Sequence, residues 1–242
     1  MGTMALVNEV HGDFVPSCSE LGWVGDPKGS RLMAYEMGKL PGEVYIIARS
    51  SLTAREARLN TVQSLARYST EYHPSGSPGF FFAQSWRDAA AISKGGWADM
   101  SKVRTGCSDR LEYLAGTLPE HFLPSVADAQ AALPALLDGR YPTVLTHSDL
   151  NEVKILVSPS SGEITGVVDW PGTIDLPFGF SLYALENALG SMNDDGWTWG
   201  DDADERGQVF WDRLVEETGL FVSGPGPECW SDMAPHTTAS RE

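Results

Sequence analysis

Two aspartates in the second half of the chain stand where short apolar runs end, which is a common position for acids that do chemistry. Asp149 lies between the apolar runs 144–145 and 155–157, and Asp169 follows the run 167–168. A segment rich in Ser, Pro and Gly joins the last two runs and is typical of a hairpin loop. Such a hairpin brings the two acids close together in space. Neighbouring carboxylates can accept a proton or hold a divalent cation.

The segment around these acids resembles the aminoglycoside phosphotransferase and choline kinase-like family. Members carry a loop H-G-D-x-x-x-x-N, two short strands and then I-D-W or I-D-F, and residues 147–170 follow this order. The wider match is to fungal members and rests on Tyr35-Glu36-Met37, Leu40-Pro41-Gly42, Leu176-Pro177-Phe178-Gly179 and Leu185-Glu186-Asn187-Ala188-Leu189-Gly190. The resemblance runs from about Arg31 to about Leu220, and the combined pattern is far more specific than its pieces.

The resemblance implies ATP-dependent phosphoryl transfer to a hydroxyl group, with Mg²⁺ on the phosphates. In that chemistry Asp149 takes the role of base or proton acceptor, and Asp169 that of magnesium ligand. His147 braces the loop by hydrogen bonding, as a buried histidine more often does than it shuttles protons. Glu36 and Met37 fall where the backbone of the family's hinge meets the adenine.

Position 154 departs from the family pattern, because a lysine stands where a metal-binding asparagine is expected. Three interpretations of Lys154 are open: a solvated side chain at a strand edge, an ammonium group between Asp149 and Asp169 in place of the metal ion, or a charge for a phosphate of the cofactor. We favour the second, because the family's asparagine points into that site. Ser148 also departs, since the family has glycine beside the catalytic aspartate.

The segment before residue 31 is too short for the phosphate-gripping half of such a kinase. The resemblance implies a phosphate-covering loop, a strand lysine that grips phosphates and a helix glutamate that orients it. Lys28 is the only lysine before Arg31, and it lies in a turn sequence. The glycines at 22, 25 and 29 do not follow G-x-G-x-x-G, so we interpret them as a turn between strands.

Composition excludes several classes of function. The net charge of −16 argues against nucleic acid, whose phosphates need Lys and Arg, and against an anionic membrane surface. Three cysteines, far apart in the sequence, form neither a disulfide framework nor a zinc motif, which indicates a reducing compartment, the cytoplasm. We find no signal peptide, and no apolar run is long enough to span a bilayer.

Periodicity predicts that helices dominate after residue 50 and pack around the one hairpin. A strand over 31–37 comes first, and the predicted helices cover 53–68, 108–118, 128–137, 180–189 and 204–219. Pro134 is expected to bend or divide the third helix, and Gly219 to end the last. We interpret two features as structural: a solvated face formed by Arg55, Arg58 and Arg67, and a core or interface position for Phe80-Phe81-Phe82.

The acidic run at 201–205 looks like the D-D-x-x-E metal motif of terpene cyclases. We prefer a simpler interpretation, because acids at the N-terminus of a helix are favoured by its dipole.

These features predict an α+β protein of protein-kinase-like fold, with a mostly helical C-lobe and a truncated N-lobe. The expected domains are a residual N-lobe and hinge at 1–41, a C-lobe at 42–222 and a disordered tail at 223–242. The predicted function is that of a degenerate family member, a pseudokinase impaired in ATP-dependent transfer that binds a small molecule in the cleft. Two alternatives stay open: an active small-molecule kinase, and a repurposed enzyme of secondary metabolism that uses the same cleft.

Overall fold

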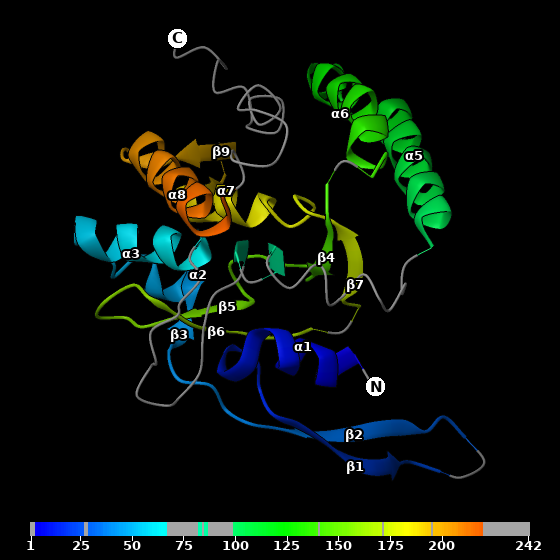
Figure 1. The fold of residues 1–242 in the computed structure, drawn as a ribbon, viewed down its shortest axis with the longest axis vertical. Helices are drawn as coiled ribbons and strands as arrows, with labels where there is room; N and C mark the ends of the chain where they lie inside the picture. The colour runs from blue at the N-terminus through cyan, green and yellow to red at the C-terminus, as the bar shows by residue number, and fades with distance from the viewer. Residues whose placement is uncertain are drawn as a thin grey trace.

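The chain folds into helices and short antiparallel strands (Figure 1). The computed structural model describes residues 3–26, 29–66, 82–83, 85–86, 99–139, 141–170, 172–194 and 196–219. Lys28, Arg67 and the predicted tail at 223–242 lie outside these residues. In the described part of the chain, no helix is long and apolar enough to cross a membrane.

The helices are α1 (Thr3–His11), α2 (Tyr45–Ala48), α3 (Arg55–Ala66), α5 (Met100–Thr117), α6 (Leu123–Leu136), α7 (Tyr183–Leu189) and α8 (Ala203–Thr218), with the 3-10 turns η1 (Gly12–Phe14) and η2 (Glu120–Phe122). The strands are β1 (Cys18–Val24), β2 (Leu32–Met37), β3 (Glu43–Val44), β4 (Thr143–Thr146), β5 (Ile155–Val157), β6 (Ile164–Val167), β7 (Ile174–Pro177), β8 (Gly190–Asn193) and β9 (Gly196–Trp199). The predicted α+β class is confirmed.

The predicted hairpin is formed by β5 and β6, with Ile155 opposite Val167. Both side chains are buried, so the apolar runs enter the core as their composition requires. β3 adds a third strand at the β5 edge. Beyond the paired residues, the N–H of Val168 donates to the carbonyl oxygen of Lys154 at 2.9 Å. The hairpin therefore brings Lys154 next to the chain that leads into Asp169.

The prediction that helices surround a single hairpin is wrong, because the second half of the chain holds two more antiparallel pairs. β4 pairs with β7, and β8 pairs with β9. β7 is too short to show a clear alternation and contains a buried acid, Asp175. The β8–β9 pairing extends from Gly190 and Trp199 to Asn193 and Gly196, within a segment that looks in the sequence like an acidic loop.

Several helix boundaries differ from the prediction. α5 begins earlier, because the side chain of Asp99 accepts hydrogen bonds from backbone N–H groups of its first turn. α6 also begins earlier, and Pro134 lies inside it without dividing it. α7 begins later, because residues 178–182 form turns. α8 ends as predicted, at Gly219 in the left-handed conformation with φ of 63°.

One hydrophobic core joins the N-terminal helix to the rest of the fold. Val7 and Val10 of α1 are buried in the same cluster as Ile155 of β5 and Phe210 of α8. Phe82 belongs to this cluster too, as predicted for the aromatic run, and the two phenylalanines before it lie outside the described residues. The first helix is therefore part of the body of the protein, whereas the β1–β2 hairpin extends away from it (Figure 1).

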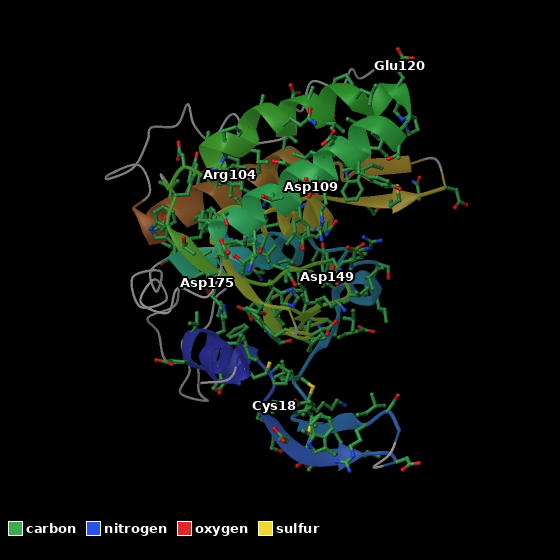
Figure 2. All side chains as sticks on the ribbon, turned by 90° about the vertical axis from the view of Figure 1, so that its right-hand side faces the viewer. Cys18, Arg104, Asp109, Glu120, Asp149 and Asp175 are labelled. Atoms are coloured by element: carbon green, nitrogen blue, oxygen red, sulfur yellow. The ribbon has the colours of Figure 1, made fainter. Side chains whose placement is uncertain are left out.

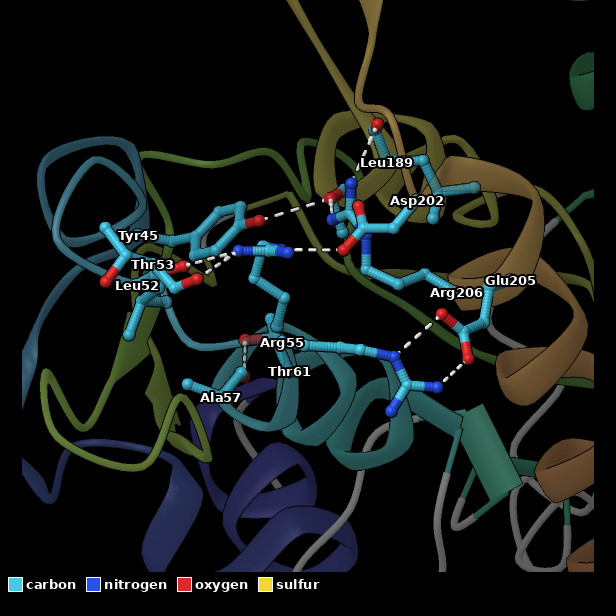
Figure 3. Close-up of polar contacts among 12 residues, drawn as sticks. Tyr45, Leu52, Thr53, Arg55, Ala57, Thr61, Leu189, Asp202, Glu205 and Arg206 are labelled. Atoms are coloured by element: carbon cyan, nitrogen blue, oxygen red, sulfur yellow. Dashed lines mark hydrogen bonds and ion pairs between the residues drawn. The ribbon is translucent and has the colours of Figure 1, made fainter.

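Ion pairs join α3 to α8, so the interpretation of the α3 arginines as a solvated face is wrong for Arg58 (Figure 3). Arg58 Nε donates to one carboxylate oxygen of Asp202 at 2.7 Å, and Arg206 Nε donates to the other at 2.8 Å. At the exposed end of the same contact, Arg55 binds Glu205. Two acids of the run that resembled a metal motif are thus held by arginines.

We predict that Asp202→Asn lowers the free energy of unfolding at pH 7 by about 1–3 kcal/mol, the usual cost of losing hydrogen bonds to a charged group. Partial burial raises the pKa of Asp202, but the hydrogen bond from Arg58 and the charge of Arg206 outweigh it, and the pKa is lowered. The contribution is therefore present above the unfolded pKa near 4 and is lost as the pH falls further. The measurement is urea denaturation at pH 7 and pH 3.

The matched control is Asp201→Asn, the neighbouring exposed acid, which should change stability by less than about 0.5 kcal/mol. An equal loss in both variants would contradict the role of the Asp202 ion pairs.

Candidate functional site

β4 ends at Thr146 and leads directly into His147, which is 1% exposed. Its Nε2 lies 3.0 Å from the carbonyl oxygen of Val168, and the backbone N–H of Asp149 donates to its Nδ1 at 3.2 Å. A ring nitrogen that accepts from an N–H carries no proton, so Nε2 is the donor and the imidazole is neutral. Burial lowers the pKa of His147, in agreement with a neutral ring. The loop is therefore braced by hydrogen bonds, as expected.

Trp170 connects the braced loop to the N-terminal helix. Its ring centroid lies 4.9 Å from that of His147 and 4.9 Å from that of His11 on α1. Its indole N–H donates to the carbonyl oxygen of Val167 at 2.8 Å. His11 is almost fully buried, and burial, together with the nearby His147, lowers the pKa of His11 to about 3. Two neutral imidazoles and an indole thus link α1 to the ends of β4 and β6.

Lys154 contacts both acids of the predicted site. Its ammonium group donates to Asp169 Oδ2 and lies 3.9 Å from Asp149 Oδ2. The lysine side chain is 19% exposed, so it lies along the protein surface and not out in solvent. The hydrogen bond to Asp169 raises the pKa of Lys154, which keeps the group positively charged at neutral pH. The predicted position of the ammonium group is confirmed.

The two acids differ in how they are held. Asp169 has φ of 65°, and it is the one non-glycine residue with positive φ in the described chain. Such a conformation costs about 1–3 kcal/mol, and residues held in it cluster at functional sites. Asp149 is 66% exposed, and its carboxylate accepts a hydrogen bond from Asn151 Nδ2 at 3.0 Å. The backbone of Asp169 is thus constrained, and both side chains reach solvent, Asp149 with 66% and Asp169 with 50% of its surface exposed.

These residues do not fit a magnesium ion. Mg²⁺ prefers oxygen ligands in near-octahedral geometry, whereas position 154 presents an ammonium group that only donates hydrogen bonds. That group already occupies an oxygen of Asp169. At the magnesium position that the resemblance implies for Asp169, an ammonium group of the chain therefore stands in place of the expected asparagine ligand.

A cavity of about 600 Å³ lies beside this site, between the segment after β2 and the strands β3 and β5. Most of its lining is apolar, and the lining residues are Pro16, Met37, Gly38, Lys39, Leu40, Gly42, Glu43, Val44, Ile47, Leu156, Val168 and Asp169. Met37 and Asp169 both line this cavity. Glu36 is not among the lining residues, and its carboxylate instead accepts a weak hydrogen bond from Ser19 Oγ at 3.4 Å.

Sequence reasoning missed two residues that support the loop. Ser181 Oγ donates to the carbonyl oxygen of His147 at 3.2 Å. Burial raises the pKa of Tyr183, and the nearby negative charge of Asp149 raises it further. The Tyr183 hydroxyl also forms a hydrogen bond with the backbone of Leu150. Both residues follow β7, whose pairing with β4 brings them to the loop. The sequence signal for both residues is the strand β7, whose four residues are too few for alternation to predict it.

We predict that the stability of the protein falls by about 2 kcal/mol between pH 7 and pH 5 because of His11. The folded-state pKa of His11 is lowered to about 3, so the unfolded chain binds a proton below pH 6.5 that the folded chain does not. The contribution of the neutral ring is complete above pH 6.5 and is lost as the pH falls. His11→Phe should flatten the pH dependence measured by urea denaturation. His121→Phe, at an exposed histidine of η2, should leave it unchanged; equal flattening in both would contradict the account.

Comparisons with known proteins show the fold. No family profile and no curated protein matches the sequence. Among solved structures, the GDP complex of wild-type aminoglycoside 2'-phosphotransferase-IIIa matches with a TM-score of 0.54 and 14% identity, over 95% of this chain and 67% of that chain. The GDP and kanamycin complex of APH(2")-IIia matches with a TM-score of 0.51 and 15% identity, over 91% and 69% of the two chains. The chain therefore has the protein-kinase-like fold of these phosphotransferases, as predicted.

Proposed function

We propose that this protein is a pseudokinase of the aminoglycoside phosphotransferase type, which binds a small molecule in its cleft and is impaired in ATP-dependent phosphoryl transfer. The observation that carries the proposal is the ammonium group of Lys154, which contacts the carboxylates of both Asp149 and Asp169. Phosphoryl transfer in this fold depends on metal ions that neutralise the phosphates and on a free base beside the acceptor. Here a side chain of the protein takes the place of the metal.

The lysine opposes a bound metal ion in two ways. It uses a carboxylate oxygen of Asp169 that a metal would need, and its positive charge repels a divalent cation at the same point. Without the metal, a nucleoside triphosphate brings its full negative charge to a chain of net charge −16. Of the residues that line the cavity, Lys39 is the one cation, beside the acids Glu43 and Asp169. The charges around the cavity therefore disfavour ATP.

The cavity suits a neutral and largely apolar ligand. Its volume of about 600 Å³ is in the usual range for small-molecule sites, which are mostly apolar with a few polar groups. The side chains of Leu40, Val44, Leu156 and Val168 offer no hydrogen bond to a ligand. Against these apolar side chains a charged group would lose its hydration without a hydrogen-bond partner, whereas an apolar ring system gains from burial.

One observation favours a second candidate, an active small-molecule kinase. The carboxylate of Asp149 is two-thirds exposed and is oriented by Asn151, so an acceptor hydroxyl can reach it. The two solved structures named above are complexes with GDP. Nucleotide is therefore the ligand against which the proposal has to be tested.

We predict that Mg-ATP does not raise the melting temperature of the protein, because Lys154 opposes the metal. A ligand present at a hundred times its dissociation constant stabilises a protein by about 2.7 kcal/mol, or roughly 5–10 °C for a domain of this size. Differential scanning fluorimetry with and without Mg-ATP makes the measurement. A clear rise that disappears in Asp169→Asn would support the active kinase instead.

The matched variant is Lys154→Asn, which restores the side chain that the family carries at this position. It should take up Mg²⁺ more readily, yet turnover of ATP should stay well below the ~1 per second of active kinases, since the cavity lining still lacks a set of phosphate-binding cations. Turnover at that rate in the unmodified chain, abolished by Asp149→Asn, would overturn the proposal.

We predict that a neutral fluorescent probe, N-phenyl-1-naphthylamine, binds in the cavity. Ile47→Glu places a charge on the cavity wall at a residue that is 59% exposed, so the fold tolerates it. Fluorescence titration should show affinity at least about fivefold weaker, the effect of roughly 1 kcal/mol. Ile46→Glu, at the preceding residue outside the lining, should change affinity less than about twofold by the same measure. Equal losses would place the probe elsewhere.

A further inference from the structure

The β1–β2 hairpin projects from the body of the protein with little support. Figures 1 and 2 show it from two directions at right angles, and in both it extends away from the helices, with Cys18 at its base. Within the described residues, its substantial contacts are those between its own two strands. A two-stranded hairpin on its own is at best marginally stable in water. The hairpin therefore needs a covering surface that the described chain does not supply.

The register of the two strands sorts their side chains onto two different faces. Residues directly opposite each other in an antiparallel pair point to the same side of the sheet. A shift between Glu20 and Gly22 lets Leu21 bulge out, and the pairs beyond it follow in order. The face we call the aromatic face carries Cys18, Glu20, Trp23, Met33, Tyr35 and Met37. The opposite face carries Ser19, Gly22, Val24, Leu32, Ala34 and Glu36.

The aromatic face has the composition of a protein interface. Trp23 is 63% exposed, Tyr35 56% and Met37 49%. Trp and Tyr are the residues most enriched among those that dominate binding energy, and Met is enriched at interfaces. Glu20 is the charged member of the face, and it lies on β1, an edge strand from which its carboxylate reaches solvent. The opposite face also has an exposed apolar pair, Val24 and Leu32, but it carries no aromatic side chain and its other residues are small or polar.

We propose that the aromatic face binds the same face of a second copy of this protein, so that two hairpins stack across a twofold axis. The three exposed side chains present roughly 250–400 Å² of apolar surface, taking ~150–250 Å² for a fully exposed large side chain. A standard interface buries about 800 Å² per partner, of which slightly more than half is apolar. The three side chains thus supply more than half of the apolar area that a stable dimer needs, and a twofold axis joins identical patches.

The distribution of charge favours this contact over others between copies. The chain carries a net charge of −16, so two copies repel each other over most of their surface. The segment 18–37 holds three acids and two bases, and its net charge is therefore only −1. Because the hairpin also extends from the body, stacking through it keeps the acidic bodies apart. Salt screens the remaining repulsion, so the association should strengthen as salt is added.

The proposed contact between two hairpins includes one residue that also lines the cavity. Met37 is at the end of the aromatic face and lines the cavity at the same time. A second hairpin that covers this face therefore also fixes one wall of the cavity. The dimer would narrow the range of ligands, but its formation does not depend on what the cavity binds.

Sedimentation equilibrium of the full chain tests the proposal. We expect the mass of a dimer at tens of micromolar, and tighter association at 500 mM than at 50 mM salt. Trp23→Ser should weaken association at least tenfold, and Val24→Ser, the neighbouring residue on the opposite face, less than twofold. Tyr35→Glu, which places an acid opposite its own copy, should abolish the dimer, whereas Leu32→Glu on the same strand should not.

Three outcomes would overturn the proposal: a monomer at 100 µM of the unmodified chain, equal losses in the variants of both faces, or association that weakens with salt. Circular dichroism of each variant confirms folding before the masses are compared. All three outcomes are independent of ligand binding, so they distinguish this proposal from the proposed function.

Discussion

The buried neutral imidazole of His147 is the constraint on which the candidate site depends. It accepts from the backbone of Asp149 and donates to the carbonyl oxygen of Val168, and so ties together two segments that are twenty residues apart in the chain. Hydrogen bonds in so buried a place are costly to break, because each group left alone would be desolvated without a partner. The imidazole therefore sets where both acids stand, without taking part in their chemistry.

Once His147 has set the positions of the two acids, Lys154 supplies the cation that contacts both carboxylates. In a kinase cleft one aspartate and an asparagine hold the metal ions while a second aspartate accepts a proton, and two neighbouring carboxylates repel each other unless a cation lies between them. The ammonium group of Lys154 relieves that repulsion from within the chain. The ammonium group thus offsets one of the two negative charges in the free protein, and Asp169 keeps the left-handed conformation beside the cavity. What the cavity adds is a mostly apolar surface beside the two acids.

The sequence predicted a large part of the fold, and the failures have definite physical causes. The β5–β6 hairpin, the strand at 32–37 and the last helix could be predicted because local pattern and tertiary role agree there. β7, β8 and β9 were missed, since each has four residues and is specified by its partner strand more than by its own alternation. Arg58 was taken for a surface residue, because nothing local reveals that Asp202 packs against it.

By itself, the sequence determined the loop with Asp149 and the acid Asp169 at the end of a hairpin, and its resemblance to a known family marked Lys154 as standing where an asparagine is expected. These follow from residue types at short spacing, where the chain limits what can meet. Only the tertiary structure decided that the ammonium group reaches both acids, that Met37 but not Glu36 lines the cavity, and that Trp170 packs on His11 from the other end of the chain. Contacts between distant segments depend on how whole elements pack, and packing is a property of the assembled core that no short window of sequence contains.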